Sequence, residues 1–120
     1  YGPDYSILKK AKEINKKGRV IITDDVKSAV CGANVLYTDV WSSMGEENDK
    51  GSKEKHFIGF TIDKNLLSFA NDNAIVLHCL PAYRGKEITD EVIESINSKI
   101  FDQAENRMHV QQALLSLIIS

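Results

Sequence analysis

Four side chains that can take part in chemistry follow closely on apolar runs of the sequence: Asp39, His78, Cys79 and Arg107. They supply a carboxylate, an imidazole, a thiol and a guanidinium, and Ser43 nearby adds a hydroxyl. Carboxylates bind ammonium groups and guanidinium groups bind oxyanions, while imidazoles and thiolates accept protons. Such a set could hold a zwitterionic small molecule beside an anion.

The apolar runs before these side chains are short and rich in β-branched residues, which is typical of buried parallel strands. We interpret Val20–Ile22, Val35–Thr38, Ala74–Leu77 and Lys99–Phe101 as strands. Ligands of open parallel α/β sheets bind beyond the carboxyl ends of the strands. Because Asp39 and its companions all follow such ends, we expect them to open on one edge of the sheet.

Helix signals fill the intervals between the strands. An amphipathic pattern runs from Asp4 to Ile14 and stops at Gly18. Further helices are expected after residues that can cap a first turn, namely Asp24 or Asp25, Thr61 or Asp63, Thr89, and Asp102. The polar stretches 40–55 and 78–88 are expected to be loops. The alternation predicts an α/β domain with a parallel sheet.

Bulk composition limits the class of protein. A length of 120 residues corresponds to about one domain. The formal net charge of -2 gives no reason to expect nucleic acid or an anionic membrane as a partner. No apolar stretch approaches the roughly 20 residues of a membrane span, and no secretory signal is visible. With only two cysteines, Cys31 and Cys79, we expect a reduced, cytoplasmic protein.

Each candidate also has a purely structural interpretation. Asp39 could cap a turn, Cys79 could pack in the core, and His78 could be a buried structural histidine. Arg107 could form a surface ion pair with Glu105, and such pairs contribute little.

Other polar residues are interpreted as structural. Arg84 and Glu87 are expected to form an ion pair that holds the loop 78–88. No spacing of His, Cys and carboxylates resembles a closed metal site, so no metal is expected. The glycines are scattered and form no phosphate-binding loop.

Three segments, taken as strings, are similar to motifs of the ornithine carbamoyltransferases. The string TDVWSSMGEE at 38–47 resembles their ornithine-binding loop, and HCLPAYRG at 78–85 resembles their catalytic cysteine loop. The string AENRMHVQQALL at 104–115 resembles the start of their last helix. Order and spacing agree, and the likeness runs from about Asp4 to the end of the chain.

The resemblance implies how ornithine would be bound. Asp39 resembles the carboxylate that pairs with the α-amino group of ornithine. Ser43 and Met44 resemble the loop residues that hold its α-carboxylate region.

The resemblance also implies the carbamoyl phosphate side of the site. Cys79 resembles the thiol beside the δ-amine, to which a proton-accepting role is often assigned. The backbone carbonyl of Leu80 resembles the group that holds the carbamoyl NH2, and Arg107 resembles the guanidinium that reaches the oxygens of carbamoyl phosphate. The Leu80–Pro81 bond is cis in the family, and X-Pro bonds adopt this form at low cost.

The implied reaction transfers the carbamoyl group of carbamoyl phosphate to the δ-amine of L-ornithine, and gives citrulline and phosphate in arginine metabolism. It needs no cofactor. It requires a deprotonated amine and a cation where oxyanion charge grows, which suits Cys79 and Arg107 as catalytic residues. It also requires two substrates held in contact, as two closing domains would provide.

The sequence departs from the family pattern. Ser42 replaces a small apolar residue and Tyr83 replaces a common histidine. The Ser-x-Arg-Thr phosphate loop, the His-Pro-x-Gln segment and the first strand of the second domain do not occur. The resemblance therefore implies a three-layer, Rossmann-like parallel sheet flanked by helices that lacks its first, central strand. That strand would lie between Val20–Ile22 and Ala74–Leu77.

We therefore interpret residues 1–120 as part of the C-terminal, ornithine-binding domain, inactive alone, whose parent enzyme is a homotrimer or a multiple of one. The absent N-terminal domain, which binds carbamoyl phosphate, would be its partner. Without it, several apolar residues of the last helix would be exposed: Leu114, Leu115, Leu117, Ile118 and Ile119.

Three alternatives stay open. A carbamoyltransferase for another amine, such as putrescine, is disfavoured by Asp39, Ser43 and Met44, because a diamine has no α-carboxylate to hold. A non-catalytic domain that binds an amino acid or oligomerises would not need both Cys79 and Arg107. A nucleotide-binding Rossmann domain would need a glycine fingerprint.

Overall fold

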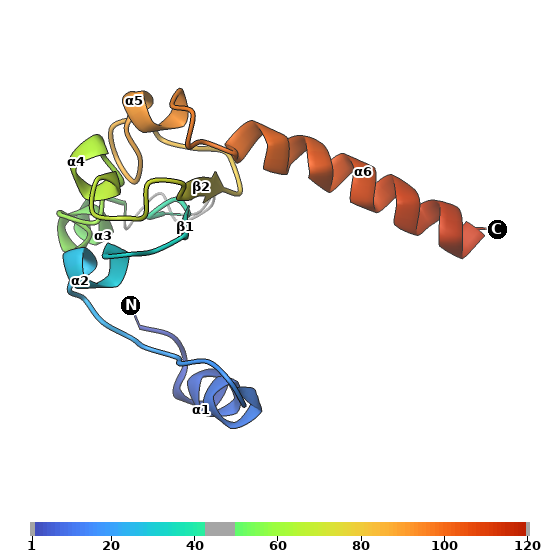
Figure 1. The fold of residues 1–120 in the computed structure, drawn as a ribbon, viewed down its shortest axis with the longest axis horizontal. Coiled ribbons are helices and arrows are strands. Elements are labelled where there is room, and N and C mark those ends of the chain that lie inside the picture. The colour runs from blue at the N-terminus through green and yellow to red at the C-terminus, as the bar shows by residue number, and fades with distance from the viewer. Residues whose placement is uncertain (1, 43–49, 120) are drawn as a thin grey trace.

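The computed structural model describes residues 2–42 and 50–119, in which pairs of helices separate the strands (Figure 1). In chain order the elements are α1 (Tyr5–Ile14), α2 (Val26–Val30), β1 (Val35–Thr38), α3 (Lys50–His56), α4 (Lys64–Leu67), β2 (Ile75–His78), α5 (Asp90–Ile93) and α6 (Ile100–Ile119). The α/β class expected from the sequence is confirmed.

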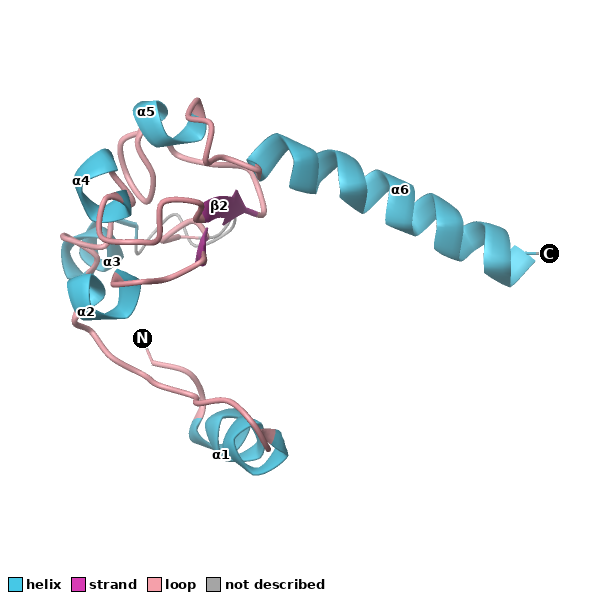
Figure 2. Cartoon of the chain, viewed as in Figure 1, coloured by secondary structure: helices cyan, strands magenta, loops and turns pink. Residues whose placement is uncertain are grey.

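Two parallel strands, β1 and β2, form the sheet of the described residues (Figure 2). The other edge of β2 is also occupied by backbone. The amide of Val76 donates to the carbonyl of Asn97 at 2.8 Å, and the amide of Lys99 donates to the carbonyl of Val76 at 2.9 Å. β2 is therefore the inner strand, and β1 lies at an edge.

Two of the expected strands are not formed. Val20–Ile22 is an extended connection, and its two isoleucines are exposed. A strand is held by hydrogen bonds to a neighbour, and no segment within 2–42 or 50–119 pairs with this one. The prediction of a strand at Lys99–Phe101 is wrong for another reason. A single parallel bridge joins Val76 to Ser98, and α6 begins directly afterwards.

The expected place of a lost central strand, between Val20–Ile22 and Ala74–Leu77, is also wrong. Both edges of β2 carry partners, β1 on one side and Asn97–Lys99 on the other. The open edge of the described sheet belongs to β1, where Val35 and Tyr37 are exposed. A further strand could therefore pair with β1 but not with β2.

Aspartate caps start three of the helices, as expected. Asp4, Asp25 and Asp63 each accept a hydrogen bond from a backbone amide of the first turn, at 2.8, 3.1 and 2.7 Å. Gly32 follows α2 with φ +69°, a conformation that favours glycine, and it ends the helix as expected.

Three helix boundaries differ from the expectation. The polar stretch 40–55 contains most of α3, because Lys and Glu are good helix formers that polarity alone does not separate from a loop. The helix expected after Thr61 or Asp63 was to carry Ile62, Leu66, Phe69 and Ala70, but α4 stops before Phe69, whose carbonyl accepts from the amide of Gly32 at 3.0 Å. α6 begins before Asp102, which therefore lies in its first turn and does not cap it.

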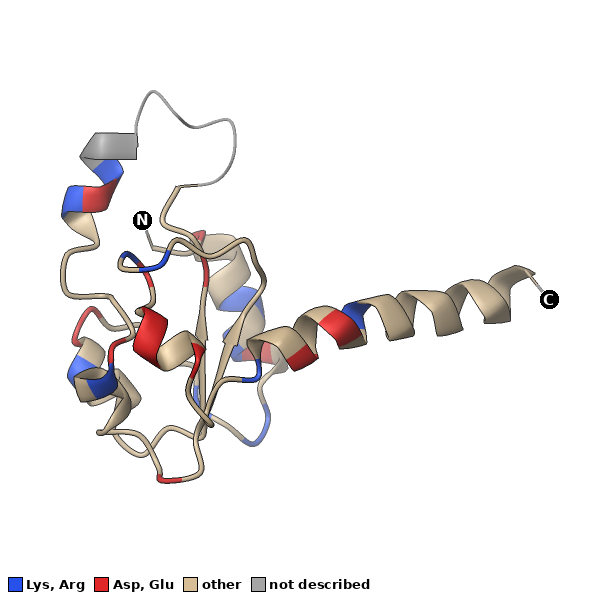
Figure 3. Cartoon of the chain, turned by 90° about the horizontal axis from the view of Figure 1, so that it is seen from above, with Lys and Arg blue, Asp and Glu red and all other residues tan. Residues whose placement is uncertain are grey.

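Two helices extend away from the body of the molecule, α1 and α6 (Figure 1). The radius of gyration is 16.6 Å, against about 14 Å for a compact chain of this length. Past Arg107, α6 carries no Lys, Arg, Asp or Glu (Figure 3). The expected exposure of its apolar residues is confirmed for Leu114, Leu115, Leu117, Ile118 and Ile119. None of the helices described could cross a membrane, on grounds of length and apolarity.

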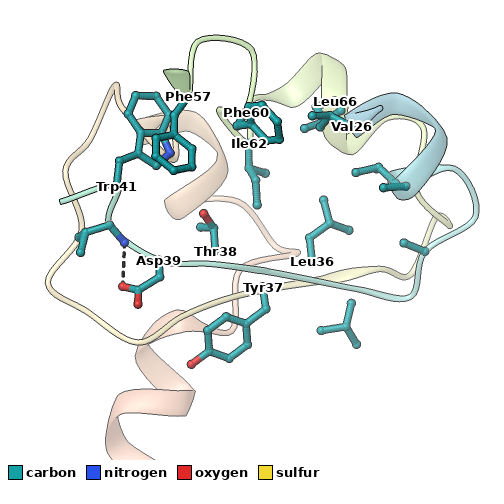
Figure 4. A pocket seen from close by; sticks show the side chains of 15 residues that line it. Val26, Leu36, Tyr37, Thr38, Asp39, Trp41, Phe57, Phe60, Ile62 and Leu66 are labelled. Atoms are coloured by element: carbon teal, nitrogen blue, oxygen red, sulfur yellow. Dashed lines mark hydrogen bonds between the residues drawn. The ribbon is translucent and has the colours of Figure 1, made fainter. Parts of the chain in front are cut away.

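The core lies between the sheet and the helices around it. Side chains alternate across β1: Leu36 points towards α2 and α4, and Tyr37 points to the opposite face, towards α6 (Figure 4). Helices therefore lie on both faces of the sheet, which gives the expected three layers. The buried apolar residues are Val30, Leu36, Ile62, Ala74, Val76, Ile88, Val92, Ile93 and Ile100.

Ile100 fixes the first turn of α6 to the core, since its side chain is 0% exposed. We expect Ile100→Ala to lower the free energy of unfolding by about 2–4 kcal/mol, from lost burial and a residual cavity. Ile96, which is 92% exposed, is the matched control. Ile96→Ala should change the free energy of unfolding by less than about 0.5 kcal/mol. Urea unfolding measures both, and equal losses would contradict this account.

Candidate functional site

The two strand ends bring Asp39 and Cys79 into contact. Thr38 pairs with His78 across the sheet, so the residues that follow them lie side by side. The Cys79 thiol donates to Oδ1 of Asp39, with 2.9 Å between Sγ and Oδ1. The convergence expected at the carboxyl edge of the sheet is therefore found for these two residues.

This hydrogen bond sets the ionisation of both groups. It is the main cause that lowers the pKa of the Asp39 carboxyl, and the main cause, ahead of burial, that raises the pKa of the Cys79 thiol. The amide of Val40 donates to the same Oδ1 at 2.7 Å and also favours the carboxylate. At neutral pH, Asp39 is therefore a carboxylate and Cys79 a thiol.

His78 is buried and holds the loop that carries Cys79. Its Nδ1 accepts from the amide of Leu80 at 2.8 Å, so the ring proton lies on Nε2, which donates to Oε1 of Glu87 at 3.1 Å. The same Oε1 accepts from the amide of Tyr83 at 2.6 Å. The structural interpretation of His78 is confirmed, and Glu87, itself fully buried, is its partner.

The rest of this loop differs from the expectation in one ion pair. The Leu80–Pro81 peptide is cis, as the resemblance implied. The expected pair between Arg84 and Glu87 is wrong, because Arg84 reaches two carboxylates of α5 and its end, those of Asp90 and Glu94, at 2.6 and 2.7 Å. Glu87 instead turns inward to the buried histidine.

Arg107 is exposed in the N-terminal half of α6. The pair with Glu105 that a structural role would need is not formed among the described residues, and Glu105 lies 3.4 Å from His109 instead. The guanidinium of Arg107 is close enough to Cys79 to lower the pKa of the thiol, against the larger opposing effects of Asp39 and burial. Arg107 thus joins Asp39 as a charged group within electrostatic range of the Cys79 thiol.

Ser43 and Met44, expected to hold the α-carboxylate region of ornithine, lie outside the described residues. An aromatic cluster flanks them in the sequence and consists of Trp41, Phe57 and Phe60. The rings of Trp41 and Phe57 stack with centroids 5.8 Å apart, and Phe57 meets Phe60 edge-on at 6.1 Å.

A hollow of about 460 Å³ lies beside β1, below the helices α2 and α4 (Figure 4). Its lining is mainly apolar, the aromatic cluster forms one end, and Thr38 and Asp39 supply polar atoms. Cys79 and Arg107 do not line it. The reacting groups of the expected chemistry therefore do not meet inside this hollow.

Asp39, His78 and Cys79 each offer an atom that could bind a metal, and these atoms lie within 4.8 Å of one another. Sequence spacing did not indicate this cluster. Both ring nitrogens of His78 are engaged, with Leu80 and Glu87, and the thiol is engaged with Asp39. Because a cation would have to replace these hydrogen bonds, the arrangement favours a hydrogen-bonded pair over a metal centre.

The hydrogen bonds made by the side chains of Gln103 and Lys86 could not be predicted from the sequence. Gln103 accepts from the amide of His78 at 3.1 Å and donates to the hydroxyl of Tyr37 at 2.8 Å. Nζ of Lys86 lies 2.6 Å from Oε1 of Glu54 and joins α3 to the loop after β2. These partners are separated by 25, 66 and 32 positions, so no local pattern could have indicated them.

Glu87 satisfies two buried donors, the His78 ring and the Tyr83 amide. We expect Glu87→Leu to lower the free energy of unfolding by about 2–4 kcal/mol, because both donors would lose their acceptor. Glu91→Leu removes an exposed carboxylate paired with Lys64, so it should cost less than about 1 kcal/mol. Urea unfolding compares them, and a Glu87 variant no less stable than the control would refute the role.

The ionisation of Cys79 can be read from its alkylation, because the thiolate is the reacting species. In a Cys31→Ser background, we expect Asp39→Asn to lower the pKa of Cys79 and to speed its reaction with iodoacetamide at pH 8 by roughly threefold. Asp102→Asn, an exposed control on α6, should leave the rate unchanged. A rate profile over pH that does not move in Asp39→Asn would show that this carboxylate does not govern the thiol.

Comparisons with known proteins show the family of the chain. The family described as "Aspartate/ornithine carbamoyltransferase, Asp/Orn binding domain" matches residues 1–118. The ornithine carbamoyltransferase of Prochlorococcus marinus subsp. pastoris is 64% identical over 99% of this chain, which covers 39% of that protein. That of Acidothermus cellulolyticus is 51% identical, with the same coverage of 99% and 39%.

Solved structures show the same relationship. Ornithine carbamoyltransferase from Thermus thermophilus superposes with a TM-score of 0.82 at 37% identity, over 100% of this chain and 37% of that one. The anabolic enzyme from Campylobacter jejuni gives a TM-score of 0.71 at 49% identity, over 78% of this chain and 31% of that one. The chain spans about two fifths of the length of the curated relatives it matches. With a family match over residues 1–118 and neighbours of Rossmann-like α/β fold, the chain belongs to the aspartate/ornithine carbamoyltransferase family and forms part of its Asp/Orn binding domain.

Proposed function

We propose that the protein acts as an ornithine carbamoyltransferase and that these residues form its ornithine-binding part. The carbamoyl group passes from carbamoyl phosphate to the δ-amine of L-ornithine, and citrulline and phosphate are released. The proposal rests on the contact between Asp39 and Cys79 at the carboxyl edge of the sheet. It is supported by 64% identity to an ornithine carbamoyltransferase.

Asp39 has the chemistry to bind the α-ammonium group of ornithine. Its Oδ1 accepts from the Cys79 thiol and the Val40 amide. Its Oδ2 accepts no hydrogen bond from a described residue, so one oxygen of an exposed carboxylate is available to a cation. We assign the α-carboxylate region of the ligand to Ser43 and Met44.

The proton of the δ-amine needs an acceptor as the amine attacks. A bond forms between this nitrogen and the carbamoyl carbon, and the carbon–oxygen bond to phosphate breaks and leaves its electron pair on phosphate. Cys79 is held as a thiol, so it can take the amine proton only if it gives up its own. The Sγ–H···Oδ1 contact offers a path, in which that proton passes to Asp39.

Leu80 and Arg107 are assigned to the carbamoyl phosphate side. The backbone carbonyl of Leu80 would accept from the carbamoyl NH2. The guanidinium of Arg107 makes no ion pair within the described part of the chain, and is available to pair with the oxygens where negative charge grows. No cofactor takes part in this scheme.

The remaining contacts to the phosphate group are assigned to residues beyond these 120. A carbamoyl-phosphate-binding domain would complete the site, and the exposed apolar residues of α6 would pack against it. We propose that these residues are inactive alone, and that the complete enzyme is a homotrimer or a multiple of one and works in the cytoplasm in arginine metabolism. The names of relatives include both a catabolic enzyme, from Thermoplasma volcanium, and the anabolic one from Campylobacter jejuni.

A second substrate deserves a direct comparison. A solved structure described as an N-acetyl-L-ornithine transcarbamylase superposes with a TM-score of 0.67 at 33% identity. The higher identity to the Prochlorococcus ornithine enzyme, 64%, favours the free amino acid. An exposed carboxylate at position 39 also suits an α-ammonium group better than an acetylated nitrogen.

A chimera tests the function directly. The matching segment of the Prochlorococcus enzyme is replaced by this chain, and citrulline is measured with carbamoyl phosphate and L-ornithine. We expect turnover with ornithine, and about 100-fold lower kcat/KM with putrescine or N-acetyl-L-ornithine, because polar groups of the site would lose their partners. A folded chimera without turnover would refute the assignment, and a preference for either competitor would change the substrate.

Two cysteine variants of the chimera provide a matched pair. Cys79→Ala should lower kcat by about 10²–10³-fold if the thiol handles the amine proton. Cys31→Ala removes the other free thiol, which is exposed, and should leave kcat within about twofold. The 120-residue chain alone should form no citrulline, and turnover by it would overturn the proposed division of the site.

A further inference from the structure

α6 is attached to the body of the molecule only at its start, and the rest of it projects outward (Figure 1). Ile100 is buried there, and Gln103 and Ala104 are half-buried. From Glu105 to Ile119 every side chain is exposed. Within the described chain, the direction of the helix therefore depends on the few contacts of its first turns.

Gln103 makes the polar contacts of this attachment, and they reach both strands. Its Oε1 accepts from the amide of His78, the last residue of β2, at 3.1 Å. Its Nε2 donates to the hydroxyl of Tyr37 on β1 at 2.8 Å. One side chain thus bridges the two strands at the edge where the candidate site lies.

The same side chain is coupled to two site residues by its place in the sequence. Arg107 follows Gln103 by four positions in a helix, so the two lie on one face, one turn apart. Cys79 follows His78 directly at the end of β2. The hydrogen bond between Gln103 and His78 therefore also fixes the position of the helical turn that carries Arg107 relative to the loop that begins with Cys79.

We propose that Gln103 is a positioning residue, which bridges Tyr37 and His78 and thereby holds Arg107 beside Cys79. Its meaning for catalysis rests on the proposed function, in which Arg107 meets carbamoyl phosphate. If the bridge is lost, α6 can turn about Ile100, and the guanidinium moves away from the thiol. Gln103 itself need not touch a substrate.

The thiol reports this displacement without any turnover. Among the described residues, the charged groups that act on Cys79 are Asp39, which raises its pKa most, and Arg107, which lowers it; the titratable His78 precedes it in the chain. Losing the cation should raise the pKa of the Cys79 thiol, and only slightly, because Arg107 is exposed and its charge is screened by solvent. At a fixed pH below that pKa, alkylation should then slow by about two- to threefold.

The experiment measures the pH profile of Cys79 alkylation in the 120-residue chain with Cys31→Ser. Gln103→Leu is compared with Arg107→Gln, with the double variant, and with Gln111→Leu as the same substitution two turns further along α6. We expect Gln103→Leu and Arg107→Gln to shift the profile in the same direction. The double variant should shift it no further than Arg107→Gln alone, and Gln111→Leu should not shift it.

Several results would overturn the proposal: no shift in folded Gln103→Leu, no shift in Arg107→Gln, or shifts that add in the double variant. Circular dichroism checks the fold. If Gln103→Leu unfolds, Tyr37→Phe removes one of the two hydrogen bonds and should give a smaller shift in the same direction, whereas no shift would count against the bridge.

Turnover in the chimera supplies the catalytic readout. Gln103→Leu should lower kcat/KM for carbamoyl phosphate by about tenfold. Gln103→Glu should restore it, because two carboxylate oxygens can accept from the His78 amide and from the Tyr37 hydroxyl. Failure of this rescue overturns the bridge. An inactive parent chimera refutes only the proposed function, since the thiol measurement is independent of it.

Discussion

The parallel pairing of β1 with β2 is the constraint on which the site depends. It places Thr38 opposite His78, and therefore Asp39 beside Cys79. A slip of one residue would turn every side chain of the slipped strand to the opposite face of the sheet and separate the pair. Backbone bonds on both edges of β2 and the fully buried side chain of Val76 resist such a slip. The chemistry of the site is thus a consequence of strand register.

Local signals in the sequence were sufficient for the elements that carry the site. β1 and β2 were predicted within one residue. The cap Asp4 was predicted outright, and Asp25 and Asp63 were each one of two predicted candidates, because such signals rest on a pattern a few residues long. Val20–Ile22 has the same local pattern, but a strand also needs a neighbour, and none of the described segments supplies one. Pattern alone could not reveal that difference.

The supporting contacts of the site could not be predicted in the same way. Glu87 and Arg84 are close in sequence and opposite in charge, but burial of His78 draws Glu87 inward and leaves Arg84 to Asp90 and Glu94. Choosing between these partners requires knowing which side chain is buried. The resemblance supplied roles for Asp39 and Cys79, while the raised pKa of the thiol, which makes it a donor at rest, follows only from their contact in the folded chain.

The outer part of α6 has a consequence for how the polypeptide behaves in solution. Beyond Arg107 it carries no formal charge, and the whole chain carries only -2. Electrostatic repulsion between copies of the chain is therefore weak, while the exposed leucine and isoleucine side chains of the outer turns of α6 attract other apolar surfaces. The isolated polypeptide should be colloidally unstable, with a solubility set by this one helix. A mild detergent, or acidic residues placed on its outer turns, should disperse it without disturbing the sheet edge.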